Sequence, residues 1–275
     1  MRPPQIVKNG LILLPLLFSG ELFQLEAVGR VLGIFVIFSV FVGSTYVIND
    51  YKDRVVDRSH PEKKKRPLAS GKLHAGFALT FAMVLIVLSL IGAYRMGGVW
   101  ILLLFLLYWI NTTLYTLRVK HLVILDVFSI ALGMVMRGVI GIAVLQAVYS
   151  IWFLLVIFFG ALWFGYMKRY QEVQLGTHSR KILTSYNASF LEQIIGMITT
   201  VLITTYSFYT FNSVQSIRIV LSLPVFVFCI IRFYYTIFFQ KNYQQAIERI
   251  IFSDPWLWGS TVLYLVLTMG IVYFC

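Results

Sequence analysis

The sequence reads NDYKDRVVD at residues 49–57 and RPLASG at residues 66–71, and the first of these stretches directly follows a long apolar run at residues 29–50. Carboxylates are costly beside lipid, and those that occur there are usually retained because they serve a site. The position of these acidic residues therefore indicates a membrane protein whose functional site lies at the end of a membrane-spanning segment.

The overall composition also indicates a membrane protein. The chain has 275 residues, of which 59% are hydrophobic and 12% are charged, whereas soluble domains carry about 25% charged residues. The net charge of +12 lies in the connections between apolar segments, where membrane topology and anionic ligands explain it better than a nucleic acid does. Cys229 and Cys275 match no metal or disulfide spacing.

The apolar runs predict an all-α, polytopic fold. Each run is near the ~20 residues that a helix needs to cross a bilayer core, although Pro15 and Glu21 interrupt the first. We expect about nine transmembrane helices in a single domain over residues 1–275. The expected spans are 9–25, 29–50, 74–94, 97–117, 122–146, 150–168, 190–211, 217–238 and 256–274.

The distribution of basic residues predicts the orientation. Of the 23 lysines and arginines, nineteen fall on the side of the membrane that holds residues 49–57, three fall on the other side, and Arg137 lies within a span. Cytoplasmic loops carry such an excess. We therefore expect a multi-pass protein of the cell (inner) membrane, with its amino terminus and its site in the cytoplasm and its carboxyl terminus outside.

The spacing of the first acidic motif, which comprises Asn49, Asp50, Asp53 and Asp57, predicts a metal site. Residues three and four apart share a helix face, so Asn49, Asp53 and Asp57 form a column of oxygen ligands. Asp50 lies on the same face because Asp53 is three residues after it. Clustered oxygen ligands suit Mg²⁺, which usually binds together with a phosphorylated substrate. The alternative is a helix end with Asp–Lys ion pairs of small energetic value.

A basic run at residues 60–67, HPEKKKRP, follows this motif and provides candidate phosphate-binding residues, Lys63 and Arg66. Basic side chains beside a Mg²⁺ site can bind the phosphate oxygens that the metal leaves uncovered. Lys8 and Arg58 on the same side are further candidates for substrate binding. The alternative for the lysines is a purely topological role.

A second cytoplasmic segment, residues 169–189, follows the sixth span, and the basic second motif KRYQE stands at residues 168–172. Its single carboxylate, Glu172, favours phosphate binding over a second metal site. Lys168 and Glu172 are candidate catalytic residues, although their i, i+4 spacing also fits an ordinary helix-end ion pair. Arg169, Arg180 and Lys181 are candidates for substrate binding.

The fifth span carries two further candidates, Asp126 and Arg137. They are three helical turns apart and so share one face, about 16 Å apart along the axis. An arginine within a span faces a cavity or a partner, so Arg137 fits either a lipid-phosphate pocket or a lock between helices. Both are candidates for substrate binding, and Asp126, nearer the cytoplasmic end, is the better candidate for the site.

These motifs resemble those of the UbiA superfamily of intramembrane prenyltransferases. Asn49, Asp50, Asp53 and Asp57 match the family pattern N-D-x-x-D-x-x-x-D, and residues 66–71 match its R-P-L-A-S-G tail. The resemblance covers essentially the whole chain. It implies nine helices around a central cavity, with a Mg²⁺-bound diphosphate at the cytoplasmic end.

One departure from the family is informative. Typical members have a second aspartate-rich motif after the sixth span, and the basic second motif stands there instead. This replacement resembles the decaprenyl-phosphate phosphoribosyltransferase branch. The same branch is suggested by residues 2–9, 15–20, 60–63, 125–127 with Arg137, and 179–181.

The resemblance to this branch implies transfer of 5-phosphoribose from phosphoribosyl diphosphate to a polyprenyl phosphate, with Mg²⁺ as cofactor and diphosphate as leaving group. Two alternatives stay open: a prenyl diphosphate-dependent transferase acting on an aromatic or other acceptor, and a non-catalytic carrier of anionic lipids.

Overall fold

The computed structural model describes residues 7–58, 63–147, 150–176, 181–212, 217–241, 243 and 247–274, and this part of the chain is helical without a β-strand. The α-helices are α2 (Leu14–Phe18), α3 (Leu25–Arg58), α4 (Ala75–Leu117), α5 (Leu125–Leu145), α6 (Ile151–Gln174), α7 (Ala188–Phe211), α8 (Leu223–Phe238), α9 (Ile247–Ser253) and α10 (Pro255–Phe274). Short 3₁₀ helices are η1 (Gly10–Ile12), η2 (Lys63–Lys65), η3 (Val119–His121), η4 (Lys181–Ser185) and η5 (Ile217–Ser222).

Seven helices in the described residues are long and apolar enough to cross a membrane. Within a bilayer every backbone N–H and C=O group must find a partner inside the protein, and a helix meets that requirement within one segment. The all-α, polytopic fold class is therefore confirmed. The expected count of nine spans is not confirmed, and α4 and the amino-terminal segment account for the difference.

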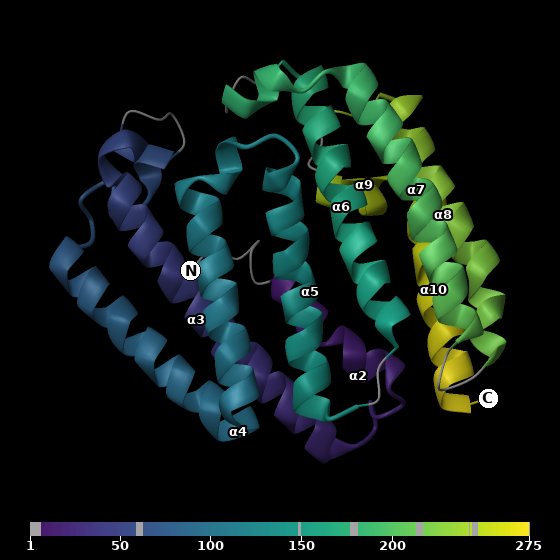
Figure 1. Cartoon of the computed structure of the whole chain (residues 1–275), viewed down its shortest axis with the longest axis horizontal. Coiled ribbons are helices and arrows are strands. Elements are labelled where there is room, and N and C mark those ends of the chain that lie inside the picture. The colour runs from purple at the N-terminus through teal and green to yellow at the C-terminus, as the bar shows by residue number, and fades with distance from the viewer. Residues whose placement is uncertain are drawn as a thin grey trace.

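Helix α4 contains two of the expected spans. With 43 residues it would be about 65 Å long if straight, twice the ~30 Å of a bilayer core. Its backbone is non-helical at Gly97 and Gly98, and Gly98 has a φ of +66°, which glycine adopts without the penalty of a side chain. Figure 1 shows α4 bending back at this point into two arms that run in opposite directions.

The amino-terminal segment, Val7–Phe18, is apolar but shorter than a membrane span. It packs against α5, where a Cβ on Gly141 would lie 2.3 Å from the carbonyl oxygen of Ile12. The glycine therefore permits the close contact between η1 and α5. Asn9 donates a hydrogen bond to Ser39 Oγ at 3.0 Å, and Ser39 lies near the middle of α3.

The described interior contains two large apolar clusters, one in each half of the chain, and a smaller third one around Tyr206, Tyr209, Ile219 and Ile271. Residues of η1, α2, α3, α4 and α5 form the first, which contains Phe38, Phe41 and Phe105. Residues of α5 to α10 form the second, around Trp163 and Tyr166. Helix α5 contributes to both large clusters. In a membrane this close packing, rather than the hydrophobic effect, holds helices together.

Three charged segments gather at one end of the bundle, the upper end in Figure 1: the carboxyl end of α3, the connection between α4 and α5, and the connection between α6 and α7. Helix α3 has 34 residues, about 51 Å at 1.5 Å per residue, so its last turns extend beyond a bilayer core. The helix thereby carries the first acidic motif out of the apolar region.

Candidate active site

The first acidic motif is helical throughout, as its spacing predicts, and forms the last turns of α3. Its four side chains differ in exposure. Asn49 and Asp50 are half-buried, Asp53 is exposed, and Asp57 is only 3% exposed. The four residues of the motif, which the sequence pattern does not distinguish, therefore differ in how accessible their side chains are.

Arg66 lies between two carboxylates of this motif. Its Nη1 is 2.6 Å from Oδ2 of Asp57 and 3.1 Å from Oδ1 of Asp50. A buried carboxylate is strongly destabilising unless it is paired, and Arg66 supplies the counter-charge for Asp57. The sequence indicated that Arg66 binds phosphate, but it gave no sign that the same side chain pairs with the acidic motif.

The chain after η2 folds back on α3 and so brings Arg66 to the motif. The backbone N–H of Ser70 donates to the carbonyl oxygen of Arg66 at 2.8 Å, and that of Leu73 donates to Pro67 at 3.1 Å. Arg58 Nε, at the end of α3, donates to the carbonyl oxygen of Ala69 at 3.1 Å. This hydrogen bond gives Arg58 a structural role besides the substrate binding that the sequence predicts.

The first acidic motif has the donor chemistry for Mg²⁺. The side chains of Asn49 and Asp53 make no hydrogen bond or ion pair with the described residues, and amide and carboxylate oxygens are the ligands that Mg²⁺ prefers. No group of three or more His, Cys, Asp or Glu side chains in the described ranges is placed to hold a metal ion. Mg²⁺ is usually bound through one or two carboxylates together with substrate phosphates, and Asn49 and Asp53 provide oxygen ligands of that kind.

The basic second motif lies in the last turns of α6 and forms a buried charge network. Arg169 Nε donates to Asp126 Oδ2 at 2.9 Å, and Arg169 Nη1 donates to Glu172 Oε2. Asp126 has no exposed surface and Arg169 is 3% exposed. Lys168 is half-buried and has a partner of its own. The structure therefore joins Arg169, Glu172 and Asp126, three of the predicted site residues.

Tyr186, which follows η4, completes this network. Its hydroxyl donates to Asp126 Oδ1 at 2.7 Å and accepts a hydrogen bond from the backbone N–H of Ile124 at 2.8 Å. Burial raises the pKa of Tyr186 above its ordinary value, so the hydroxyl keeps its proton and acts as a donor. Sequence reasoning gave Tyr186 no role, because nothing in the local pattern pairs it with a residue sixty positions earlier.

Arg137 joins three segments of the bundle. It donates to Asn9 Oδ1 at 2.9 Å, to the carbonyl oxygen of Gly133 at 2.7 Å and to the hydroxyl of Tyr108 at 2.8 Å. The guanidinium carbon also lies 4.8 Å from the ring centroid of Tyr108, a cation–π distance. These contacts support the helix-lock alternative for Arg137 over a lipid-phosphate pocket. The sequence gave no sign of its partners Asn9 and Tyr108.

For several predicted site residues the structure gives only part of the information needed to assign a role. Arg180 lies outside the described residues, and the side chains of Lys63 and Lys181 are not described. Lys8 is half-buried in the amino-terminal segment and has a partner. The roles predicted for these four residues remain predictions.

The comparison with protein families identifies the fold. The model of the UbiA prenyltransferase family matches residues 13–253. The chain belongs to the UbiA family. It is therefore a membrane transferase of this prenyltransferase family, as the motifs at residues 49–57 and 66–71 indicated.

Curated relatives share a considerable part of this UbiA chain. The decaprenyl-phosphate phosphoribosyltransferase of Mycobacterium tuberculosis is 32% identical over 220 residues, which cover 77% of this chain and 72% of the relative. The protein of the same name from Corynebacterium glutamicum is 32% identical over 222 residues, 78% of this chain and 67% of the relative.

Solved structures confirm the UbiA fold. A UbiA homolog from Archaeoglobus fulgidus bound to DMAPP and Mg²⁺ superimposes with a TM-score of 0.70 at 16% identity. The match covers 98% of this chain and 96% of that chain. At this level of identity the similarity concerns the fold alone.

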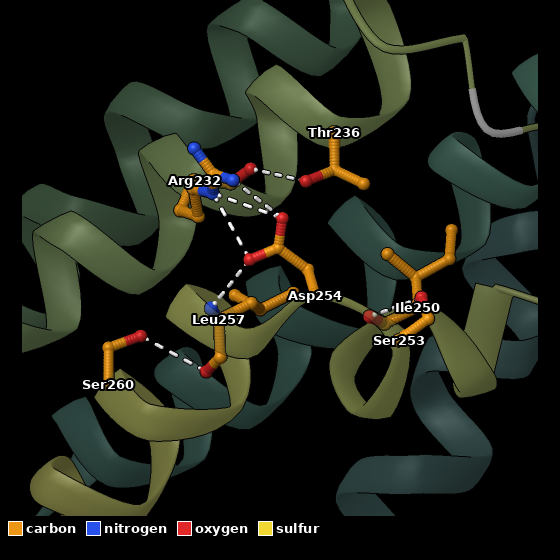
Figure 2. Close-up of polar contacts among 7 residues, drawn as sticks. All are labelled: Arg232, Thr236, Ile250, Ser253, Asp254, Leu257 and Ser260. Atoms are coloured by element: carbon orange, nitrogen blue, oxygen red, sulfur yellow. Dashed lines mark hydrogen bonds and ion pairs between the residues drawn. The ribbon is translucent and has the colours of Figure 1, made fainter.

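A further ion pair lies apart from both motifs, at the junction of α8 with α9 and α10. Figure 2 shows Arg232 directed at the carboxylate of Asp254, with Nη2 of Arg232 2.7 Å from Oδ2 of Asp254. Asp254 Oδ1 also accepts from the backbone N–H of Leu257 at 2.8 Å and so caps α10. The hydrogen bonds from Arg232 hold the pKa of Asp254 below its ordinary value.

Proposed function

We propose that this UbiA-family chain transfers 5-phosphoribose from phosphoribosyl diphosphate to a polyprenyl phosphate. An oxygen of the acceptor phosphate forms a bond to the anomeric carbon, the bond from that carbon to the diphosphate oxygen breaks, and diphosphate leaves. The acceptor oxygen is anionic at neutral pH, so the reaction needs no general base.

The basic second motif carries this proposal. It contains one carboxylate, Glu172, which forms an ion pair with Arg169. A second metal site of the kind used for prenyl diphosphates needs several free carboxylates, whereas a donor with an additional phosphate needs cations. The relatives that share 32% identity are named for phosphoribosyl transfer, which supports the same reading.

The first acidic motif is proposed to hold the diphosphate through Mg²⁺, with Asn49, Asp50, Asp53 and Asp57 as the candidate ligands. When bound, Mg²⁺ neutralises charge on the departing diphosphate. Positive charge develops on the anomeric carbon in the transition state, so stabilisation of the leaving group is the main catalytic task. Arg66 lies beside these carboxylates and is placed to donate to diphosphate oxygens as well.

The second cytoplasmic segment is proposed to bind the remaining phosphates. Lys168, Arg169, Arg180 and Lys181 would bind phosphate oxygens together with Lys63, and Glu172 would contact the metal or the ribose hydroxyls. Lys8 and Arg58 remain candidates for the substrate headgroups. Arg137, with its nitrogens engaged by Asn9, Gly133 and Tyr108, is not part of this proposal.

The positive-inside pattern supports a site on the cytoplasmic face of the cell membrane, with the amino terminus inside and the carboxyl terminus outside. Residues 1–275 would form a single UbiA-like transmembrane domain, since the family match spans most of the chain.

The test measures diphosphate release by purified protein with Mg²⁺ in two reactions. The first contains a polyprenyl phosphate and phosphoribosyl diphosphate, and the second contains a prenyl diphosphate and an aromatic acceptor such as 4-hydroxybenzoate. We expect lipid-dependent release in the first reaction alone. Release only in the second would overturn the proposal in favour of prenyl transfer, and release in neither would favour the carrier.

A further inference from the structure

Among the charged side chains of the candidate site that the structure describes, that of Asp126 is the most deeply buried. It has no exposed surface, and each of its carboxylate oxygens accepts one hydrogen bond: Oδ2 from Arg169 and Oδ1 from Tyr186. A carboxylate without exposed surface cannot contact a bound substrate, even though each oxygen could accept a further hydrogen bond. Its carboxylate therefore interacts with Arg169 and Tyr186 rather than with a substrate.

Arg169 is held on two sides by carboxylates. Asp126 on α5 binds its Nε and Glu172 on α6 binds its Nη1. A guanidinium is planar, so two charge-assisted bonds to different nitrogens fix both its position and the direction in which it faces. A lysine in the same place would provide a point charge without that direction.

Tyr186 connects this network to the backbone at the start of α5. Its hydroxyl accepts from the N–H of Ile124, and Ile124 has a φ of +72°, a conformation that is unfavourable for a β-branched residue. Such a backbone persists only when its surroundings hold it in place. The Tyr186 hydroxyl thus binds the strained turn before α5 and the carboxylate of Asp126 at the same time.

We propose that Asp126 and Tyr186 are positioning residues that set the orientation of Arg169, and through it of Glu172, toward the phosphoribosyl donor. The two residues act on the substrate only through Arg169. This inference rests on the proposed function, because it assigns Arg169 and Glu172 to the donor. It differs from the prediction made from the sequence, in which Asp126 contacts substrate directly.

The decisive variant is Tyr186→Phe, with Tyr206→Phe as the matched control. Both tyrosines are buried, and the hydroxyl of each makes two hydrogen bonds; that of Tyr206 contacts Ser222 and Tyr264. The two substitutions remove the same group, so their effects on thermal unfolding in detergent should be similar. We expect only Tyr186→Phe to raise the Michaelis constant for phosphoribosyl diphosphate, by about three- to tenfold, with a smaller effect on kcat.

A double-mutant cycle tests whether Tyr186 acts through Arg169. Arg169→Lys alone should raise the same Michaelis constant by tenfold or more, because lysine cannot keep both carboxylate bonds. Adding Tyr186→Phe to Arg169→Lys should then have almost no further effect, since the group being oriented is already lost. Multiplicative effects would show that Tyr186 works independently of Arg169 and would overturn the proposal.

A second pair of variants keeps the test decisive if Tyr186→Phe does not fold. Asp126→Asn preserves the shape of the side chain and removes its charge, and Asp254→Asn makes the same change in another Arg–Asp pair whose carboxylate is buried (Figure 2). A raised Michaelis constant for the donor in Asp126→Asn alone supports positioning. Equal values in both variants would overturn it.

The outcomes separate this inference from the proposed function. If the wild-type protein releases no diphosphate from phosphoribosyl diphosphate, the proposed function fails. If the wild-type protein is active but Tyr186→Phe behaves like Tyr206→Phe, the proposed function stands and the positioning role fails.

Discussion

Arg66 and Asp57 form an ion pair at the end of α3, with Nη1 of Arg66 2.6 Å from Oδ2 of Asp57. Asp57 belongs to the acidic motif of a UbiA-family protein and yet is buried, while Asp53, one turn earlier on the same helix, is exposed. Within the motif, the Asp57 carboxylate therefore holds Arg66 in place, while the Asp53 carboxylate remains exposed at the end of α3.

Removal of Arg66 should destabilise the protein more than removal of the whole pair. Arg66→Met leaves the buried Asp57 without its counter-charge, and breaking such a pair is far more costly than replacing both members. We expect a loss of about 2 kcal/mol in the free energy of unfolding, less than for a fully buried pair because Arg66 is partly exposed.

The double variant Arg66→Met/Asp57→Asn should recover a large part of that loss. Thermal or denaturant unfolding of the two variants in the same detergent measures the difference. A double variant no more stable than Arg66→Met would show that the pair is not the source of the stability.

Asp53→Asn should abolish turnover without loss of stability. The Asp53 side chain is exposed and unbonded in the described residues, so its replacement should change the free energy of unfolding by no more than about 0.5 kcal/mol. Loss of a metal ligand at the leaving group should lower kcat/KM by about a hundredfold or more. Diphosphate release and thermal unfolding measure the two effects, and near-normal activity would contradict the metal assignment.

Arg137→Met should destabilise the bundle. The substitution removes the hydrogen bonds that Arg137 donates to Asn9 Oδ1, to the carbonyl oxygen of Gly133 and to the hydroxyl of Tyr108, at about 1–3 kcal/mol for each group that stays unsatisfied. We expect a loss of about 2–4 kcal/mol in stability.

Arg95→Met provides the control for this variant, because Arg95 is exposed and should contribute little. The Michaelis constant for the lipid phosphate should stay within about twofold of wild type in whatever fraction of Arg137→Met remains folded. A large rise in that constant with unchanged stability would instead support the lipid-phosphate pocket.

The pair between Arg232 and Asp254 should contribute stability that depends on pH. The pKa of Asp254 is lowered in the folded protein, while an unfolded aspartate titrates near about 3.9. The contribution is therefore fully present above about pH 4 and is lost as the pH falls through the lower folded value. Asp254→Asn should cost about 1–2 kcal/mol at pH 7, because it weakens both the ion pair and the α10 cap.

The difference in unfolding midpoint between wild type and Asp254→Asn should shrink when both are measured near pH 3. A difference that is constant from pH 7 to pH 3 would show that the carboxylate charge is not involved.

The sequence by itself determined the fold class and the helical conformation of the first motif. Lipid leaves a long apolar segment little choice but a helix, and the i, i+4 spacing of Asn49, Asp53 and Asp57 places their side chains on one face wherever that helix lies. Both depend on local properties of the chain. Two features depend instead on packing and backbone geometry: the short segment Val7–Phe18 and the turn at Gly97 and Gly98. The expected count of nine spans did not take either feature into account.

Only the tertiary structure decided which charges meet. Arg169 pairs with Asp126 forty-three residues away, and Arg137 binds Asn9 across 128 residues. The sequence contains several carboxylates that each arginine could pair with. Which pair forms depends on how the helices pack and on how the loop that carries Arg66 folds back on α3. The same packing buries Asp57 and leaves Asp53 exposed. Helix periodicity places both side chains on one face of α3, but it does not determine which neighbouring segment covers each of them.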